Sequence, residues 1–238
     1  MKNLTVAKFG KSGNIKLGNS TWTFSKLAGN TEFTSVYGTC TGSCGKYCSG
    51  CWHRGGCYVW KSYRYPSVVK GHMRNTIAFR NDLDAAFENL AKQLDRARNK
   101  PFMVRINQAG ELETAAEFSH WCDIASKNPG VNFWLYTKAF DIAIPALLAG
   151  KVPENVTVLV SIWHEYGVEE YNSVKHLSNV KAFVYMDGFN YSDLGIQVTT
   201  TCKAYNEAGK LDHDVTCDKC KKCFNRLVSC KVIGCNAH

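Results

Sequence analysis

Between residues 81 and 201 the sequence alternates short apolar runs with longer segments of helical periodicity. Asn81 or Asp82 can cap a first helix, and Thr114 with Glu117 forms a capping box for a second one. Further helices are predicted from about residue 141 and at 168–177. Five strands are predicted in the same region, at 102–106, 132–136, 156–161, 181–186 and 196–201. Units of about 24 to 30 residues are typical of parallel βαβ folds.

A further strand is predicted at 34–37, which gives about six parallel strands. That number is too small for a closed eight-stranded barrel, so a partial (β/α) barrel or an open doubly wound sheet fits. We expect an α/β fold in which residues 33–201 form a partial (β/α) barrel. Residues 1–32 form a polar segment with one short strand candidate at 22–25, and residues 202–238 form a small cysteine-rich, metal-binding extension.

The loop from residue 40 to residue 57 contains five of the twelve cysteines and too many glycines for a helix. Within it, Cys44, Cys48 and Cys51 form a CxxxCxxC triplet, a spacing that suits a soft-metal cluster. Structural zinc is the alternative, because His53 lies inside the loop. Disulfides would need an oxidising compartment, which the rest of the sequence does not indicate.

The N-terminus lacks an apolar signal-peptide region, and no run of apolar residues is long enough to span a membrane, so we expect a cytoplasmic protein. Cysteines stay reduced there and are available as ligands. The net charge of +9 favours phosphates or nucleic acid as partners, although the basic residues are spread along the chain without a run. Two bound clusters would lower that charge to roughly +6.

Polar residues follow each predicted strand, and the carboxyl ends of parallel strands meet at one edge of a sheet. These strand-end residues are Gly110 and Glu111, Thr137 and Lys138, Ser161 to Glu165, Asp187, and Cys202. A functional site is therefore expected at that edge, although turns and helix caps explain part of the pattern.

Together the cysteine triplet, the Gly-Glu turn and the serine in VLVSIW resemble the radical S-adenosylmethionine (SAM) superfamily over residues 33–190. The resemblance implies that the three cysteines bind a [4Fe–4S] cluster whose open iron site binds SAM. It also places Gly110 and Glu111 at the methionyl end, Ser161 near the ribose, and Thr137 and Lys138 along the rim. The chain departs from the family in having Gly50 before the third cysteine, where an aromatic residue is usual, and Ala109 in place of the first glycine; Trp52 could stack on the adenine instead.

The implied reaction is reductive cleavage of SAM to a deoxyadenosyl radical, which abstracts hydrogen from an unidentified substrate. The electron would come from a reductant such as flavodoxin or ferredoxin. Asp187 is the candidate catalytic acid or base, and the alternative is a turn residue before Gly188.

The C-terminal segment contains a second cysteine motif, CxxCxxC, formed by Cys217, Cys220 and Cys223. Ferredoxin-type cluster loops use this spacing, and Cys202 or Cys235 would supply the fourth ligand. Zinc bound by four cysteines, or by three and a histidine, is the alternative to a second [4Fe–4S] cluster. The segment resembles the auxiliary cluster region of some radical SAM enzymes. Cys122 lies on the apolar face of a predicted helix and is expected to be core.

The stretches 57–75 and 105–111 and the cysteine-rich tail also resemble a phage protein family known as a gene product of unknown function. Two other functions therefore remain open. One is a zinc-containing barrel enzyme acting on nucleic acid, similar to a transglycosylase, with Asp187 as nucleophile. The other is a metal-stabilised protein that binds nucleic acid or a protein through its basic surface.

Overall fold

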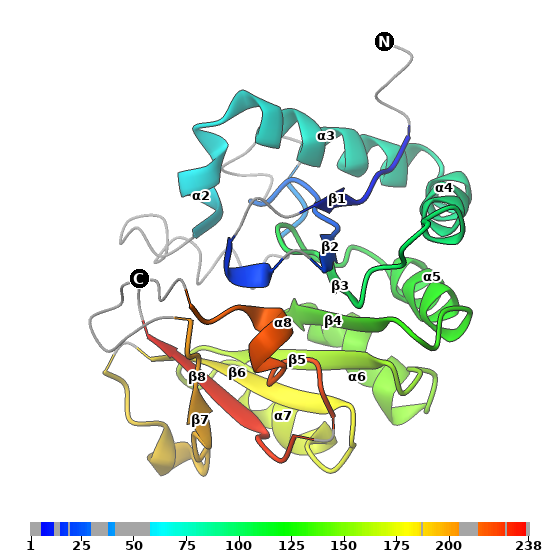
Figure 1. Ribbon diagram of the computed structural model, residues 1–238. Helices are drawn as coiled ribbons and strands as arrows, with labels where there is room; N and C mark the ends of the chain where they lie inside the picture. The colour runs from blue at the N-terminus through cyan, green and yellow to red at the C-terminus, as the bar shows by residue number, and fades with distance from the viewer. Residues whose placement is uncertain are drawn as a thin grey trace.

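The computed structural model describes residues 6–11, 15–18, 20–29, 38–40, 58–186, 188–204, 214–226 and 228–236. Its strands form one eight-stranded sheet in the order β1-β2-β3-β4-β5-β6-β8-β7 (Figure 1). The strands are β1 (Gly10–Lys11), β2 (Thr21–Thr23), β3 (Met103–Ile106), β4 (Asn132–Thr137), β5 (Val156–Ile162), β6 (Val180–Met186), β7 (Thr200–Thr201) and β8 (Val232–Asn236). Seven strands are mutually parallel, and β1 alone pairs antiparallel with β2.

The predicted strands β3 to β6 are confirmed with boundaries within one residue. The predicted strand at 196–201 shortens to the two residues of β7. The predicted strand at 34–37 lies outside the described residues. The place beside β3 belongs to β2, which corresponds to the short strand candidate at 22–25.

Helices connect the strands, and the four helices predicted between residues 81 and 177 are confirmed. They are α2 (Tyr58–Tyr63), α3 (Pro66–Asn81), α4 (Leu83–Asp95), α5 (Ala115–Ser126), α6 (Phe140–Leu148), α7 (Val168–Val174) and α8 (Cys217–Cys220), with short 3-10 turns η1 (Ile15–Leu17) and η3 (Tyr191–Leu194). The Asp82 side chain caps α4 by accepting a hydrogen bond from the Ala85 N–H at 2.9 Å. Thr114 caps α5 in the same way, through the Glu117 N–H at 3.1 Å.

The sheet has two differently covered faces, because successive side chains on a strand point to opposite sides. Val104, Leu135 and Val158 face the core shared with helices α4 to α7. Met103, Trp134 and Leu159 face the opposite side, where they pack with Phe224 and other residues of the C-terminal segment. We call this second side the tail face. Figure 1 shows α8 against the tail face, with α6 and α7 behind the sheet.

Strands β2 to β6 therefore follow one another in the sheet with their helices on one side, as in a (β/α) barrel that stays open. This confirms the expected partial barrel. The sheet also draws on both ends of the chain, because β2 and β8 lie outside residues 33–201 and β8 is inserted between β6 and β7. In the part of the chain that is described, no helix has the length and apolarity needed to cross a membrane.

Candidate functional site

Four residues predicted at strand ends meet at the carboxyl edge of β3 and β4: Gly110, Glu111, Thr137 and Lys138. The Glu111 carboxylate is buried and accepts three hydrogen bonds, from the Thr137 hydroxyl at 2.8 Å, the Lys138 N–H at 2.8 Å and the Leu112 N–H at 2.9 Å. Glu111 thus joins the turn after β3 to the end of β4. We call this group the rim site.

Burial raises the pKa of the Glu111 carboxyl to about 7, against the opposing effect of its hydrogen bonds to Lys138, Leu112 and Thr137. Both of its oxygens already accept hydrogen bonds from the chain. The geometry therefore gives Glu111 a positioning role, because it orients the Lys138 backbone and the Thr137 side chain.

The start of the cysteine loop is attached to the rim site. The Thr39 hydroxyl accepts a hydrogen bond from the Glu111 N–H at 3.1 Å, and the Cys40 N–H donates to the Gly29 carbonyl at 2.9 Å. Gly110 has a φ of 81°, and a Cβ there would lie 2.5 Å from the Thr39 hydroxyl oxygen. A glycine is needed at this turn for both reasons.

The far end of the same loop is attached to the rim site as well. Val59, in the first turn of α2, is buried in a small cluster with Ala28 and Ala109, against which Cys40 and Tyr63 also pack. Ala109 immediately precedes Gly110. The two ends of the loop 41–57 therefore leave from the carboxyl edge of the sheet, next to the Gly110–Glu111 turn.

The other predicted site residues fall in different places. The Lys138 ammonium lies 5.1 Å from the centroid of the Trp163 ring, which stacks on Tyr185. Ser161 is buried and lies two residues after Leu159, hence on the tail face, whereas Thr137 lies two residues after Leu135 on the helix-covered face. The structure therefore does not group Ser161 with Glu111. Cys44, Cys48, Cys51, Trp52 and Asp187 lie outside the described residues.

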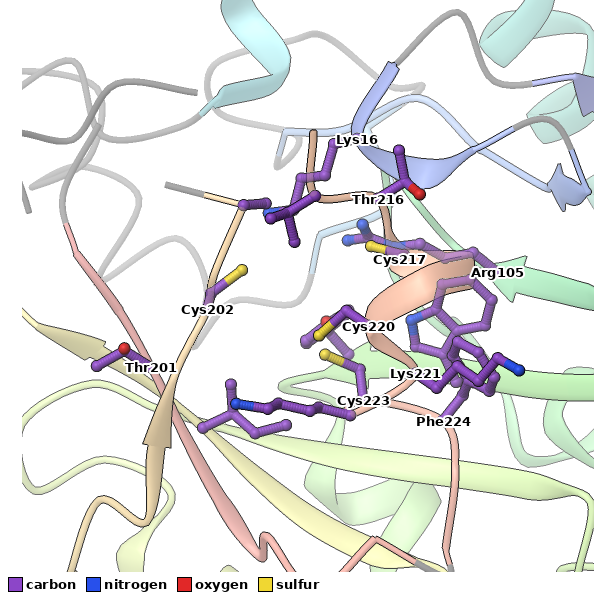
Figure 2. Close-up of a pocket in the computed structure, with 16 residues that line it drawn as sticks. Lys16, Arg105, Thr201, Cys202, Thr216, Cys217, Cys220, Lys221, Cys223 and Phe224 are labelled. Carbon is purple, nitrogen blue, oxygen red and sulfur yellow. The ribbon is translucent and has the colours of Figure 1, made fainter. Parts of the chain in front are cut away.

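A second group of predicted site residues, four cysteines, lines a pocket on the tail face with a cavity of about 30 Å³. Cys202, Cys217, Cys220 and Cys223 line it, and Figure 2 shows their sulfur atoms directed into the same space. They come from the segment after β7, from α8 and from the turn that follows α8. We call this the thiol pocket. The predicted C-terminal cysteines therefore converge, although they are separated by up to 21 residues in sequence.

Cys235 lies beside the thiol pocket on β8. The Cys202 N–H donates to the Gly234 carbonyl at 2.7 Å, so the two cysteines sit on adjacent chain segments. A hydrogen bond between the two thiols lowers the pKa of Cys202 and raises that of Cys235. Burial raises the pKa of Cys217 to about 11 and that of Cys223 to about 12.

Cationic and aromatic side chains complete the thiol pocket. Lys16, Arg105, Lys221 and Lys222 line it with Trp134 and Tyr136. The Tyr136 hydroxyl is hydrogen bonded to Cys223, and the Arg105 guanidinium lies 4.6 Å from the Tyr136 ring centroid. Among the described residues, no three His, Cys, Asp or Glu side chains form a group that could hold a metal ion in this conformation. The donor set nevertheless suits a soft metal, provided that the sulfur atoms move closer together.

Lys181 attaches the C-terminal segment beside the thiol pocket to the sheet, and the sequence analysis did not predict this role. Lys181 on β6 is 1% exposed, and its ammonium donates to the Lys222 carbonyl at 2.6 Å and the Asn225 carbonyl at 2.8 Å. The Thr157 hydroxyl donates to the Phe224 carbonyl at 2.9 Å. A single lysine in the apolar strand VKAFVYM was the available signal, because lysine is almost never fully buried without a partner.

A second missed feature is a buried ion pair near the rim site. Lys26 is fully buried, and its ammonium donates to Glu117 at 2.7 Å and Glu113 at 3.1 Å. The sequence predicts Glu117 only as part of a capping box. In the structure its carboxylate accepts hydrogen bonds from the Lys26 ammonium and from the Glu113 N–H at 3.0 Å.

The fold and these two groups define an α/β protein of the partial (β/α) barrel class with a thiol-lined pocket on its tail face. Comparison with family models is more specific. Residues 2–226 match the family described as Gene product 88, and the chain belongs to this family. The match supports the phage-protein resemblance and covers both cysteine motifs. No curated protein and no solved structure matched the chain.

Proposed function

We propose that this Gene product 88 protein is an iron–sulfur enzyme of the radical SAM type that works at the rim site. The observation that carries the proposal is the attachment of both ends of the cysteine loop beside the Gly110–Glu111 turn, through the Thr39 hydroxyl and the packing of Val59. We expect a loop attached at both ends in this way to bring its thiolates, Cys44, Cys48 and Cys51, to the rim site. Thiolates at this spacing are the ligands of a [4Fe–4S] cluster, which would supply the electron for reductive cleavage of SAM.

The chain's own residues would bind and orient SAM. Gly110 permits the left-handed turn that precedes Glu111, and the Lys138 ammonium, which lies over the Trp163 ring, would supply the positive charge for the methionyl carboxylate. Glu111 would position the site: its carboxylate accepts a hydrogen bond from the Lys138 N–H, and its own N–H donates to the Thr39 hydroxyl. Trp52 and Asp187 remain the proposed contacts for adenine and a substrate proton. Ser161 lies on the tail face, so its proposed contact with the ribose requires the nucleoside to extend from the rim site onto that face.

The test begins with iron, acid-labile sulfide and zinc per chain after anaerobic purification. The intact protein is compared with a triple variant in which Cys44, Cys48 and Cys51 are changed to alanine. We expect the triple variant to lose about four irons and four sulfides, and the intact protein to release 5′-deoxyadenosine from SAM when dithionite is added. The matched control is Cys122→Ala, a buried helix cysteine that should keep both properties. Unchanged iron in the triple variant, or no cleavage of SAM by the iron-loaded protein, would refute the proposal.

The charge distribution favours nucleic acid as the substrate. Residues 33–81 contain seven Lys and Arg but no Asp or Glu. Lys61, Arg64 and Lys70 are exposed on α2, α3 and the turn between them, and Arg64 lies over the half-exposed ring of Tyr65 at 5.0 Å. Exposed cations beside an exposed aromatic ring suit a single-stranded nucleic acid, which binds by phosphate contacts and base stacking.

Fluorescence anisotropy with a single-stranded DNA oligonucleotide tests this substrate class at several salt concentrations. Changing Lys61, Arg64 and Lys70 together to glutamine should weaken binding and lower the salt dependence by about two units in the log–log slope, since each phosphate contact contributes about 0.7. The control changes three exposed lysines elsewhere, namely Lys127, Lys151 and Lys175. Equal losses in the two triple variants would refute a specific surface on α2 and α3.

A further inference from the structure

We propose that Cys202, Cys217, Cys220 and Cys223 together bind one thiophilic metal centre on the tail face, either a zinc ion or an iron–sulfur cluster, and that Cys235 is not a ligand. This inference does not depend on the proposed function, because it concerns the thiol pocket and not the rim site.

The first argument is convergence. Cys217 and Cys220 lie at the two ends of α8, Cys223 follows in the next turn, and Cys202 reaches the same pocket from the segment after β7. Figure 2 shows the four sulfur atoms facing one another across the pocket. Four thiols from two separate segments are the usual ligand set of a structural zinc site or a cluster.

The second argument is charge. Four thiolates around a divalent zinc ion, or around a cluster of charge +2, leave a net charge of about −2. Such a charge would be costly in a pocket without cations. Here the positive charges of Lys16 and Arg105, which both line the pocket, act on Cys217. The Lys221 ammonium lies over the Phe102 ring and the Lys222 ammonium donates to Thr200, so these two lysines are at the border of the pocket.

The alternative is that these cysteines only fill apolar space, as buried cysteines often do. Cys122 shows what that role looks like here, since it is buried and does not line the thiol pocket. The four pocket cysteines differ from it in facing a shared cavity that is bordered by cations.

We place Cys235 outside the ligand set because it does not line the thiol pocket. Its thiol is hydrogen bonded to Cys202. Hydrogen bonds to a ligand sulfur are typical of the layer around a metal centre, where they tune its properties without supplying a ligand. Cys235 would therefore orient the Cys202 sulfur through this hydrogen bond without binding the metal itself.

Metal binding requires a movement that the fold permits. Lys181 and Thr157 hold the turn 222–225 on β5 and β6, so Cys223 is the most firmly placed ligand. Cys202 follows β7, which pairs with β8 through two residues. We expect Cys202 to move toward α8 when the metal binds.

The experiment uses the full chain carrying the Cys44, Cys48 and Cys51 alanine changes, so that only tail-face metal is counted. Purified anaerobically, this protein should contain about one zinc, or about four irons with four sulfides. Zinc without sulfide identifies the ion, and iron with sulfide identifies the cluster. Cys202→Ala and Cys220→Ala should each reduce the metal at least tenfold. Cys235→Ala and Cys230→Ala should retain it.

A second measurement covers the case in which a variant folds poorly or the purified protein loses its metal. Cobalt(II) is added to the reduced, metal-free chain that carries the Cys44, Cys48 and Cys51 alanine changes, here the parent chain, and to each pocket variant in that background that keeps a native circular dichroism spectrum. We expect the absorption typical of tetrahedral thiolate coordination in the parent chain and in Cys235→Ala, and its loss in Cys202→Ala. Equal cobalt spectra in the parent chain and in the variant lacking all four pocket cysteines would overturn the proposal, as would loss of metal in Cys235→Ala but not in Cys202→Ala.

Discussion

Replacing Lys181 by methionine should destabilise the protein by about 3 kcal/mol. The side chain is 1% exposed, and its ammonium makes two short hydrogen bonds to the carbonyls of Lys222 and Asn225. Hydrogen bonds to a charged group contribute about 1.5 to 3 kcal/mol each, and part of that gain is offset because burial disfavours the ammonium, as the lowered pKa of Lys181 indicates. Methionine fills similar space but leaves both carbonyls without this donor.

Urea unfolding of the metal-free, reduced protein measures this loss without a contribution from bound metal. For a chain of 238 residues, about 3 kcal/mol corresponds to a Tm lower by roughly 6 to 12 °C. The control is Lys175→Met, an exposed lysine at the end of α7 that should change stability by less than about 0.5 kcal/mol. If Lys181→Met unfolds at the same urea concentration as Lys175→Met, then Lys181 does not fasten the C-terminal segment.

Three further substitutions test the rim site and its support. Gly110→Ala should lower the unfolding free energy by about 2 to 4 kcal/mol, since its φ is positive and its Cβ would collide with Thr39; Gly150→Ala, with positive φ but open space, should lose only about 1 kcal/mol. Lys26→Met should lower the unfolding free energy, measured in urea, by about 3 to 5 kcal/mol, because it leaves the buried Glu117 carboxylate without its cationic partner. Adding Glu117→Gln should restore much of this stability. Glu111 holds a proton in the folded state that the unfolded chain releases above about pH 4.5, so the unfolding free energy should fall by up to about 3 kcal/mol as pH rises from about 4.5 to about 7. In Glu111→Gln this pH-dependent part should vanish, and an unchanged pH profile would show that Glu111 is not its source.

The repeating part of the fold could be predicted because its signals are local. Apolar periodicity, the caps at Asp82 and Thr114, and the proline and glycine stops lie within each unit, and they place β3 to β6 and α4 to α7. The pairing of the C-terminal strand β8 could not be predicted in this way. Strand β8 reads VIGCN, and nothing in those five residues indicates that they pair with β6, about 50 positions earlier.

The rim site was predicted as a set of strand-end residues, but their contacts were not. Spacing placed Glu111 beside Thr137, since parallel strands end at the same edge. That the Glu111 carboxylate accepts hydrogen bonds from the chain depends on the path of the backbone at Leu112 and Lys138. The nucleic-acid partner stays a prediction. The sequence analysis considered runs of basic residues, whereas residues 33–81 are distinguished by the absence of acidic ones.

The two cysteine motifs are attached to different parts of the sheet. The residues that flank the first motif, Cys40 and Val59, contact the fold next to the Gly110–Glu111 turn, at the C-terminal ends of the strands. The thiol pocket lies between α8 and the segment after β7, and the Lys222 ammonium donates to the Thr200 hydroxyl of β7. A metal bound there would join β7 to the segment that also supplies β8. Metal at the tail face would therefore stabilise the end of the sheet.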